Sequence, residues 1–186
     1  SDLVESYRQY QIEIMPLDDD GNAEKALVIP PEELELIGPG GEQVFQSADL
    51  PFDIALGEFH PNAIPVPAGA PIAGDAKGPE INGYKLLSRR REKEAEQNLP
   101  AVVARFQPKS GDGEPVSTFL SARSSAFDPE EQPMAFGFEI DGKPFAARMV
   151  KKNWKVPFEI RLDEFIFERH PGVSMARNYE SRITRI

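Results

Sequence analysis

The chain contains no cysteine and only two histidines. The lack of cysteine excludes disulfide bonds, thiolate nucleophiles, and zinc or iron–sulfur sites with cysteine ligands. It leaves the compartment open, because an exported domain can also lack cysteine. The sequence has no Gly-x-Ser-x-Gly motif and no phosphate-binding glycine loop. The groups that most often act as nucleophile or base are therefore scarce, and we expect a protein that is not an enzyme.

Carboxylates are the reactive groups that remain. Asp163-Glu164 and Glu58 could form an acid pair of the kind that glycoside hydrolases use. The run of residues 18–22, Asp-Asp-Asp-Gly-Asn, begins like a calcium loop, but Leu27 stands where an EF-hand has its bidentate Glu. We interpret the acid pair as solvated side chains at strand irregularities and the run as a turn, and we predict no metal site.

The sequence also lacks long apolar runs and an excess of basic residues. No run approaches the ~20 residues of a membrane-spanning helix, so we expect membrane attachment only through segments outside this sequence. With 31 acidic and 21 basic residues the net charge is −10, which argues against a nucleic-acid partner. Residues 1–80 hold 16 acidic and 3 basic residues, whereas residues 81–186 hold 15 acidic and 18 basic residues. We therefore divide the chain into an acidic portion, 1–80, and a C-terminal portion, 81–186, within one continuous β body.

Strand patterns dominate the chain. Tyr10, Ile12 and Ile14 alternate with polar residues, as in a half-buried strand. Lys109–Glu114 is rich in turn residues and predicts a hairpin between strands near 101–107 and 116–123. The dipeptide Asp141-Gly142 predicts a second hairpin through a type I′ turn. The fold class we predict is mainly β, an antiparallel β-sandwich or open barrel with one or two short helices.

Helix signals are few. Residues 88–97 combine helix-forming side chains with Ser88 as a possible N-cap, and residues 2–11 are compatible with a helical turn or two. Arg89-Arg90-Arg91 could form a basic patch for an anionic lipid or phosphate, although Glu92, Glu94 and Glu96 neutralise it within a turn. Residues 63–79 contain four prolines, which favours an extended connector packed along the body over a proline-motif ligand.

The most informative feature is an internal repeat. Leu50–Phe59 and Val156–Phe165 share the pattern apolar, Pro, Phe, acid, Ile, any, Leu, any, Glu, Phe. In each copy Phe, Ile and Leu alternate, as in a strand with one buried face, and Pro marks the strand entry.

Each copy of the repeat then departs from alternation at the same point. After the Leu, the next large apolar residue lies three positions on, at Phe59 and at Phe165. One extra residue in a strand turns the following side chain to the other face. We therefore predict a β-bulge at Gly57-Glu58 and another at Asp163-Glu164.

The two histidines follow the two copies, as His60-Pro61 and His170-Pro171. Imidazoles bind haem iron and zinc. Each His, however, precedes Pro at a strand exit, and no His-x-x-x-His pattern or carboxylate cluster accompanies it. We interpret both as turn residues, and include them among the candidate binding residues because of their matching positions.

The C-terminal segment carries a longer pattern. It runs from Pro157-Phe158 through an alternating strand to Glu-Phe, then to Pro-Gly, and then to a Tyr placed shortly before Ser. Over residues 140–186 the sequence resembles the extracytoplasmic region of ResB-like proteins, components of the system II machinery for c-type cytochrome biogenesis. His170 stands where that family commonly has Tyr. The residues that carry the pattern are Pro157, Phe158, Leu162, Phe165, Pro171, Gly172, Tyr179 and Ser181.

The resemblance implies a non-enzymatic extracytoplasmic domain of a membrane-anchored protein. Its task would be to scaffold or bind apocytochrome c and the membrane subunit that delivers haem. No cofactor is expected in this segment, although haem is possible in the full complex. The alternative is an exported β-sandwich that binds another protein or a cell-surface polymer. The candidate binding residues are His60, Phe165, His170, Pro171, Gly172 and Tyr179.

Overall fold

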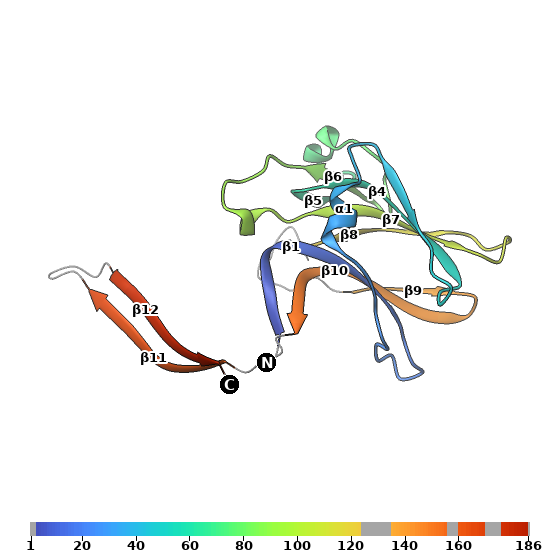
Figure 1. Cartoon of the computed structure of the whole chain (residues 1–186). Helices are drawn as coiled ribbons and strands as arrows, with labels where there is room; N and C mark the ends of the chain where they lie inside the picture. The colour runs from blue at the N-terminus through green and yellow to red at the C-terminus, as the bar shows by residue number, and fades with distance from the viewer. Residues whose placement is uncertain (1–2, 124–134, 156–159, 170–175, 186) are drawn as a thin grey trace. The chain divides into compact units, whose positions relative to one another are not determined.

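The chain forms two compact units in the computed structural model, which describes residues 3–123, 135–155, 160–169 and 176–185 (Figure 1). Side chains are described for residues 4–123 and 135–155. The larger unit is Ser6–Lys152, and the smaller one consists of Ser1–Glu5 and Asn153–Ile186. The predicted division at residue 80 lies inside the larger unit. Residue 80 marks a change in the balance of acidic and basic residues, and the division of the chain there stays a prediction.

The first sheet has the strand order β2-β1-β10-β9. The alternating residues Tyr10, Ile12 and Ile14 lie on β1 and are buried, as predicted. Strands β9 and β10 form the predicted hairpin, in which Asp141 (φ 52°) and Gly142 (φ 73°) take the two left-handed positions of a type I′ turn. The strands are β1 (Leu3–Pro16), β2 (Leu27–Ile29), β9 (Phe136–Ile140) and β10 (Lys143–Lys155).

The second sheet has the order β3-β4-β7-β8, and all its pairs are antiparallel. Strand β4 is the first copy of the repeat. It begins directly after Pro51, as predicted, because an N–H is not needed there. The predicted turn over residues 109–114 lies between β7 and β8, which form the expected hairpin. The strands are β3 (Glu42–Phe45), β4 (Phe52–His60), β7 (Ala101–Pro108) and β8 (Val116–Ser121).

The proline-rich stretch is extended at its start, as predicted. There it forms β5 (Ala63–Pro67), which pairs with β6 (Tyr84–Ser88). Ala63 and Leu86 of this hairpin pack with Ala101 of β7, a small cluster separate from the main core.

Helical structure is limited to α1 (Pro31–Glu35) and two 3₁₀ turns, η1 (Pro71–Asp75) and η2 (Ala95–Gln97), among the residues the structure describes. The predicted helix over 88–97 is wrong. Asn98 binds the backbone of Glu92 and Glu94 with its side chain and so competes with helical hydrogen bonds. The helical turn expected in 2–11 is also wrong, because that segment belongs to β1.

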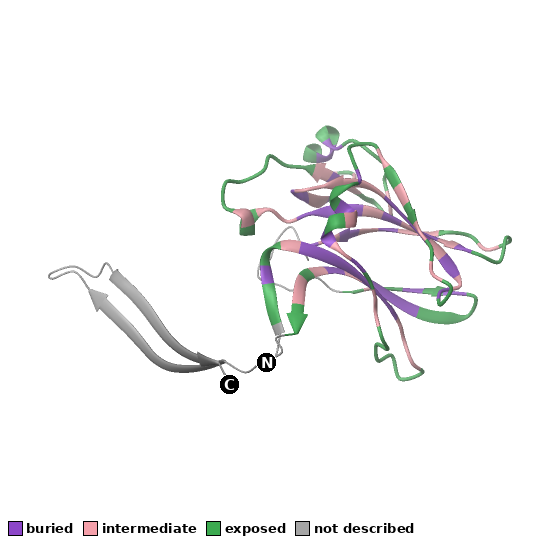
Figure 2. Cartoon of the chain, in the orientation of Figure 1, coloured by how far each residue is buried: buried purple, intermediate pink, exposed green. Residues whose placement is uncertain are grey.

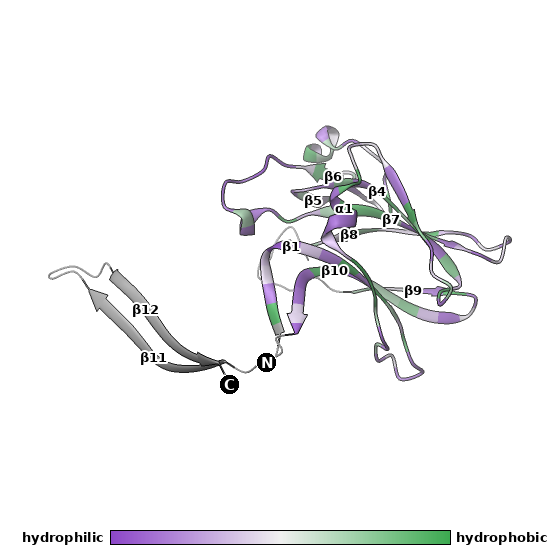
Figure 3. Cartoon of the chain, viewed as in Figure 1, coloured by the Kyte–Doolittle hydropathy of each residue, from purple (hydrophilic) through white to green (hydrophobic). Residues whose placement is uncertain are grey.

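The main core lies between the two four-stranded sheets. Buried side chains of β1, β9 and β10 join those of β4, β7 and β8 in one apolar cluster, and Figure 2 shows the buried positions on the facing strands. Figure 3 shows apolar residues on the same strands. Within the cluster the Phe52 ring centroid lies 4.9 Å from that of Phe145, 5.5 Å from that of Phe138 and 5.6 Å from that of Phe106, each edge-to-face. The predicted mainly antiparallel β fold is confirmed, in its sandwich form.

The smaller unit contains the second copy of the repeat. Strand β11 (Ile160–Arg169) carries that copy and pairs antiparallel with β12 (Ala176–Arg185). An isolated two-stranded hairpin is marginally stable in water. The smaller unit is therefore stabilised less by its own contacts than the sandwich is.

Phe52 links the two sheets, and this predicts its contribution to stability. Phe52→Ala should lower the free energy of unfolding by about 3–5 kcal/mol, because it removes a fully buried ring with three ring partners. Urea unfolding followed by circular dichroism measures this value. Val44→Ala, on the same sheet at a side chain 52% exposed, is the control and should change it by under about 0.5 kcal/mol. Equal losses in the two variants would contradict the assigned core.

Candidate functional site

Strand β4 carries the predicted bulge. Gly57 pairs with Val103 and His60 pairs with Ala101, so β4 advances by one residue more than β7. Glu58 adopts φ 51°, a left-handed conformation that is uncommon for residues other than glycine. The pairing of β4 with β3 runs without a shift. The bulge therefore faces β7.

The second copy of the repeat has the same irregularity. Leu162 pairs with Ile183 and Glu164 pairs with Arg182, so Asp163 is the extra residue in β11. Both predicted bulges are confirmed. Because the local sequences match, the departure from alternation in the two patterns has one physical cause, an extra strand residue.

The bulge in β4 decides which face of the sheet each side chain reaches. Leu56 is fully buried in the core, so regular alternation would place Gly57 outside, Glu58 inside and Phe59 outside. Instead Gly57 and Glu58 both line a cleft on the outer face. Phe59 packs against the main core. The extra residue thus keeps a carboxylate out of the core and keeps an aromatic ring against it.

The Glu58 carboxylate lies against the backbone of Gly78 and close to His60. A methyl group added at Gly78 would overlap with Glu58 Oε2, and Gly78 itself has φ 97°. His60 Nε2 lies 3.9 Å from Glu58 Oε2, and this nitrogen is buried without a hydrogen-bond partner among the described residues. His60 is therefore the neighbour of a bulge carboxylate, which the sequence pattern did not predict.

The outer cleft, as we call the depression that contains Gly57 and Glu58, has a volume of about 680 Å³. It is lined by residues of β4, β7 and β8, by residues 40–42 and by residues 79–82. Arg105 Nη2 lies 3.8 Å from Glu42 Oε1 within it. The cleft is polar and its charges are partly paired.

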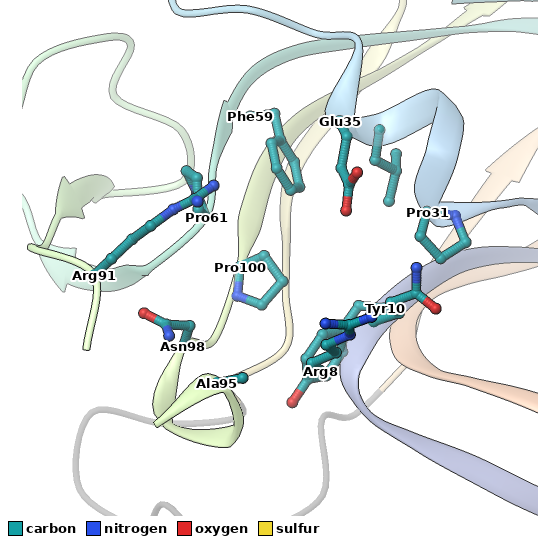
Figure 4. A pocket seen from close by; sticks show the side chains of 12 residues that line it. Arg8, Tyr10, Pro31, Glu35, Phe59, Pro61, Arg91, Ala95, Asn98 and Pro100 are labelled. Atoms are coloured by element: carbon teal, nitrogen blue, oxygen red, sulfur yellow. The ribbon is translucent and has the colours of Figure 1, made fainter. Parts of the chain in front are cut away.

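A second cleft lies on the other side of the bulge, where Phe59 reaches it; we call it the arginine cleft. It has a volume of about 190 Å³ and is drawn in Figure 4. The Phe59 ring and the Glu35 carboxylate project into it from one side, Arg8 and Tyr10 lie on the opposite side, and Arg91 lies at its edge beside Pro61. Arg91 is the one residue of the run Arg89-Arg90-Arg91 in this lining.

Sequence reasoning missed Arg8 and Glu35 of this cleft. The two are 27 positions apart, and Arg91 lies 83 positions beyond Arg8. Their proximity depends on how β1, α1 and the loop after β6 pack. No local motif could have identified it.

The remaining predicted binding residues belong to the smaller unit. Phe165 lies on β11 opposite Ser181, and Tyr179 lies on β12 opposite Phe167, so the hairpin brings both into one ladder. Their side chains lie outside the described part of the structure, as do His170, Pro171 and Gly172 altogether. The side chains of Asp163 and Glu164 are likewise outside it.

The acidic run after β1 forms a turn. Asp18 Oδ1 accepts hydrogen bonds from the backbone N–H groups of Asp20 (3.0 Å) and Asn22 (2.8 Å). These bonds, above all the one from the Asn22 backbone, lower the pKa of Asp18 from its ordinary value of 3.8. Within the described residues no group of three or more His, Asp or Glu is arranged to hold a metal ion. The turn interpretation is confirmed.

No family model matches the chain, and no curated protein matches it. In the described part of the chain, no helix combines the length and the apolar character needed to cross a membrane.

The contact between Glu58 and Gly78 yields a double-mutant test. Gly78→Ala should cost more than the roughly 1–2 kcal/mol expected from the left-handed backbone alone, because the new methyl group overlaps with the Glu58 carboxylate. Gly83→Ala is the matched control: Gly83 has φ 80° but open space around its Cα. Urea unfolding measures both costs.

The two alanine substitutions are then measured again in a Glu58→Gly background. Here Gly78→Ala should cost no more than Gly83→Ala, because the overlapping carboxylate is gone. Glu58→Gly alone should raise stability by up to about 1 kcal/mol, since glycine adopts the bulge conformation without strain. An unchanged difference between the two alanine variants in this background would contradict the contact.

Proposed function

We propose that this chain is a non-enzymatic extracytoplasmic domain of a membrane-anchored ResB-like protein, and that it binds apocytochrome c during c-type cytochrome maturation. Its partner is a membrane subunit that delivers haem, and its anchor lies in segments outside this sequence. The observation that carries the proposal is the motif Pro157-Phe158 to Ser181, which resembles that family. The motif's strand occurs twice, and each copy has a bulge shortly after its Leu.

The fold is compatible with a protein that binds an extended polypeptide. An open strand edge binds such a chain through main-chain hydrogen bonds, with little demand on its sequence. This suits apocytochromes, which share the short haem-attachment motif Cys-x-x-Cys-His and must present it in an accessible form. Scaffolding by strand addition requires no catalytic group, in line with the scarcity of nucleophiles and bases in the sequence.

Strand β3 is the edge we assign to this role. It pairs on one side with β4, and no strand of the described residues pairs with its other side. Glu42 and Val44 are exposed on it. Residues 40–42 at its start also line the outer cleft, so a chain added there would place side chains at the rim of that cleft.

Amide chemical shifts test this assignment. Adding a peptide with the sequence Cys-x-x-Cys-His should shift the amide signals of residues 42–45 in a saturable way, because new main-chain hydrogen bonds form at β3. The control peptide carries proline at alternate positions around the motif and lacks the N–H groups needed for pairing. The assignment fails if no edge-strand amide responds, or if both peptides produce equal shifts.

Co-purification tests the biological role. The full-length protein, isolated from its native membrane, should bring with it haem and subunits of cytochrome biogenesis. Recovery of a folded protein without either would contradict the role in cytochrome maturation. The alternative, an exported β-sandwich that binds another protein or a cell-surface polymer, would then become the leading explanation.

A further inference from the structure

The arginine cleft joins three separate parts of the sandwich. Strand β1 contributes Arg8 and Tyr10, helix α1 contributes Leu34 and Glu35, and the end of β4 contributes Phe59. The loop between β6 and β7 completes it with residues 91–100. All these residues belong to one compact unit, so their arrangement is that of a single folded body (Figure 4).

The floor of the cleft is apolar. Leu34 and Tyr10 are 1% and 7% exposed, and Phe59 packs against the same apolar cluster to which they belong. Pro31, Pro61 and Pro100 add further apolar surface, and proline has no N–H to offer a polar ligand. Such a floor favours an apolar group over a hydrated one.

The rim of the cleft carries two arginines without a carboxylate partner. Among the described residues neither Arg8 nor Arg91 forms an ion pair, and Glu35 is the one acidic residue in the lining. This is unusual in a chain of net charge −10. A guanidinium group beside an apolar surface binds a carboxylate through two parallel hydrogen bonds, which would compensate for the positive charge.

The loop that carries Arg91 is held in place. Asn98 Oδ1 accepts a hydrogen bond from the Glu92 N–H at 2.8 Å, and Asn98 Nδ2 donates to the carbonyl oxygens of Glu92 at 3.1 Å and Glu94 at 3.3 Å. The loop therefore does not have to be ordered when a ligand binds. A preorganised site loses less entropy on binding than a mobile one.

We propose that the arginine cleft binds a peptide in which an acidic side chain stands next to an aromatic or large aliphatic one. The apolar side chain enters beside Phe59, and the acidic side chains next to it pair with Arg91 at one edge of the cleft and with Arg8 on the side of Tyr10. The cleft has a volume of about 190 Å³, which accommodates one side chain and its neighbour. Pockets for cofactors and drug-sized ligands are larger, at roughly 300–1,000 Å³. The proposal does not depend on apocytochrome binding, which uses β3.

Fluorescence anisotropy of a labelled Asp-Phe-Glu peptide with the whole chain tests the proposal. Arg91→Gln and Arg8→Gln should each weaken binding by about tenfold, the effect of losing one charge-assisted contact. Arg90→Gln is the matched control, because it removes the same charge one residue away at a position outside the cleft lining. Its dissociation constant should stay within about twofold of that of the unchanged protein.

Two further peptides separate the contributions of the rim and the floor. Asn-Phe-Gln lacks the carboxylates and Asp-Gly-Glu lacks the aromatic ring, and both should bind about tenfold more weakly than Asp-Phe-Glu. Equal binding of Asn-Phe-Gln, or an equal loss in Arg90→Gln and Arg91→Gln, would overturn the proposal. Thermal unfolding of each variant verifies the fold, and binding of Cys-x-x-Cys-His peptides at β3 should be unchanged in Arg91→Gln.

Discussion

Between Gly57 and His60, strand β4 has one residue more than the facing segment of β7, and both clefts depend on that residue. With regular alternation Glu58 would point into the core, where an unpaired carboxylate is costly, and Phe59 would point to the outer face. Because of the bulge, Glu58 points to the outer face and Phe59 points toward the core. Glu58 then lines the outer cleft, and Phe59 forms part of the arginine cleft. A local change in register thus decides that the acid faces the outer cleft and that the aromatic ring faces the core.

The sandwich that holds the bulge is built from long-range contacts. The ring of Phe52, at the start of the strand that carries the bulge, packs against phenylalanines of β7, β9 and β10. In the other sheet, Arg148 Nη2 lies 3.2 Å from Glu13 Oε1, an ion pair between residues 135 positions apart. A fold with this topology forms only when residues that are far apart in the sequence come together. The clefts form where these distant segments meet, so their residues come from separate parts of the chain.

Local signals in the sequence predicted the features that depend on neighbouring residues. Asp141-Gly142 defines its own turn, and the interrupted alternation before Phe59 and Phe165 indicates a bulge because side-chain direction has a fixed period in a strand. The other features depend on contacts between residues that are far apart in the sequence. Residues 88–97 have helix-forming side chains, yet Asn98 and the pairing of Ser88 with Ala63 hold them in another conformation. The arginine cleft was unpredictable for the same reason, since Arg8 and Arg91 line one cleft only in the folded sandwich.

The most direct test of the bulge and of the side-chain placement it produces is a set of nuclear Overhauser contacts around β4. The bulge predicts contacts from the Phe59 ring to the buried side chains of the main core and from the Glu58 side chain to the Gly78 Hα protons. Contacts from the Phe59 ring to Gly78 or to Val103 on the outer face, with Glu58 directed at the core, would contradict it.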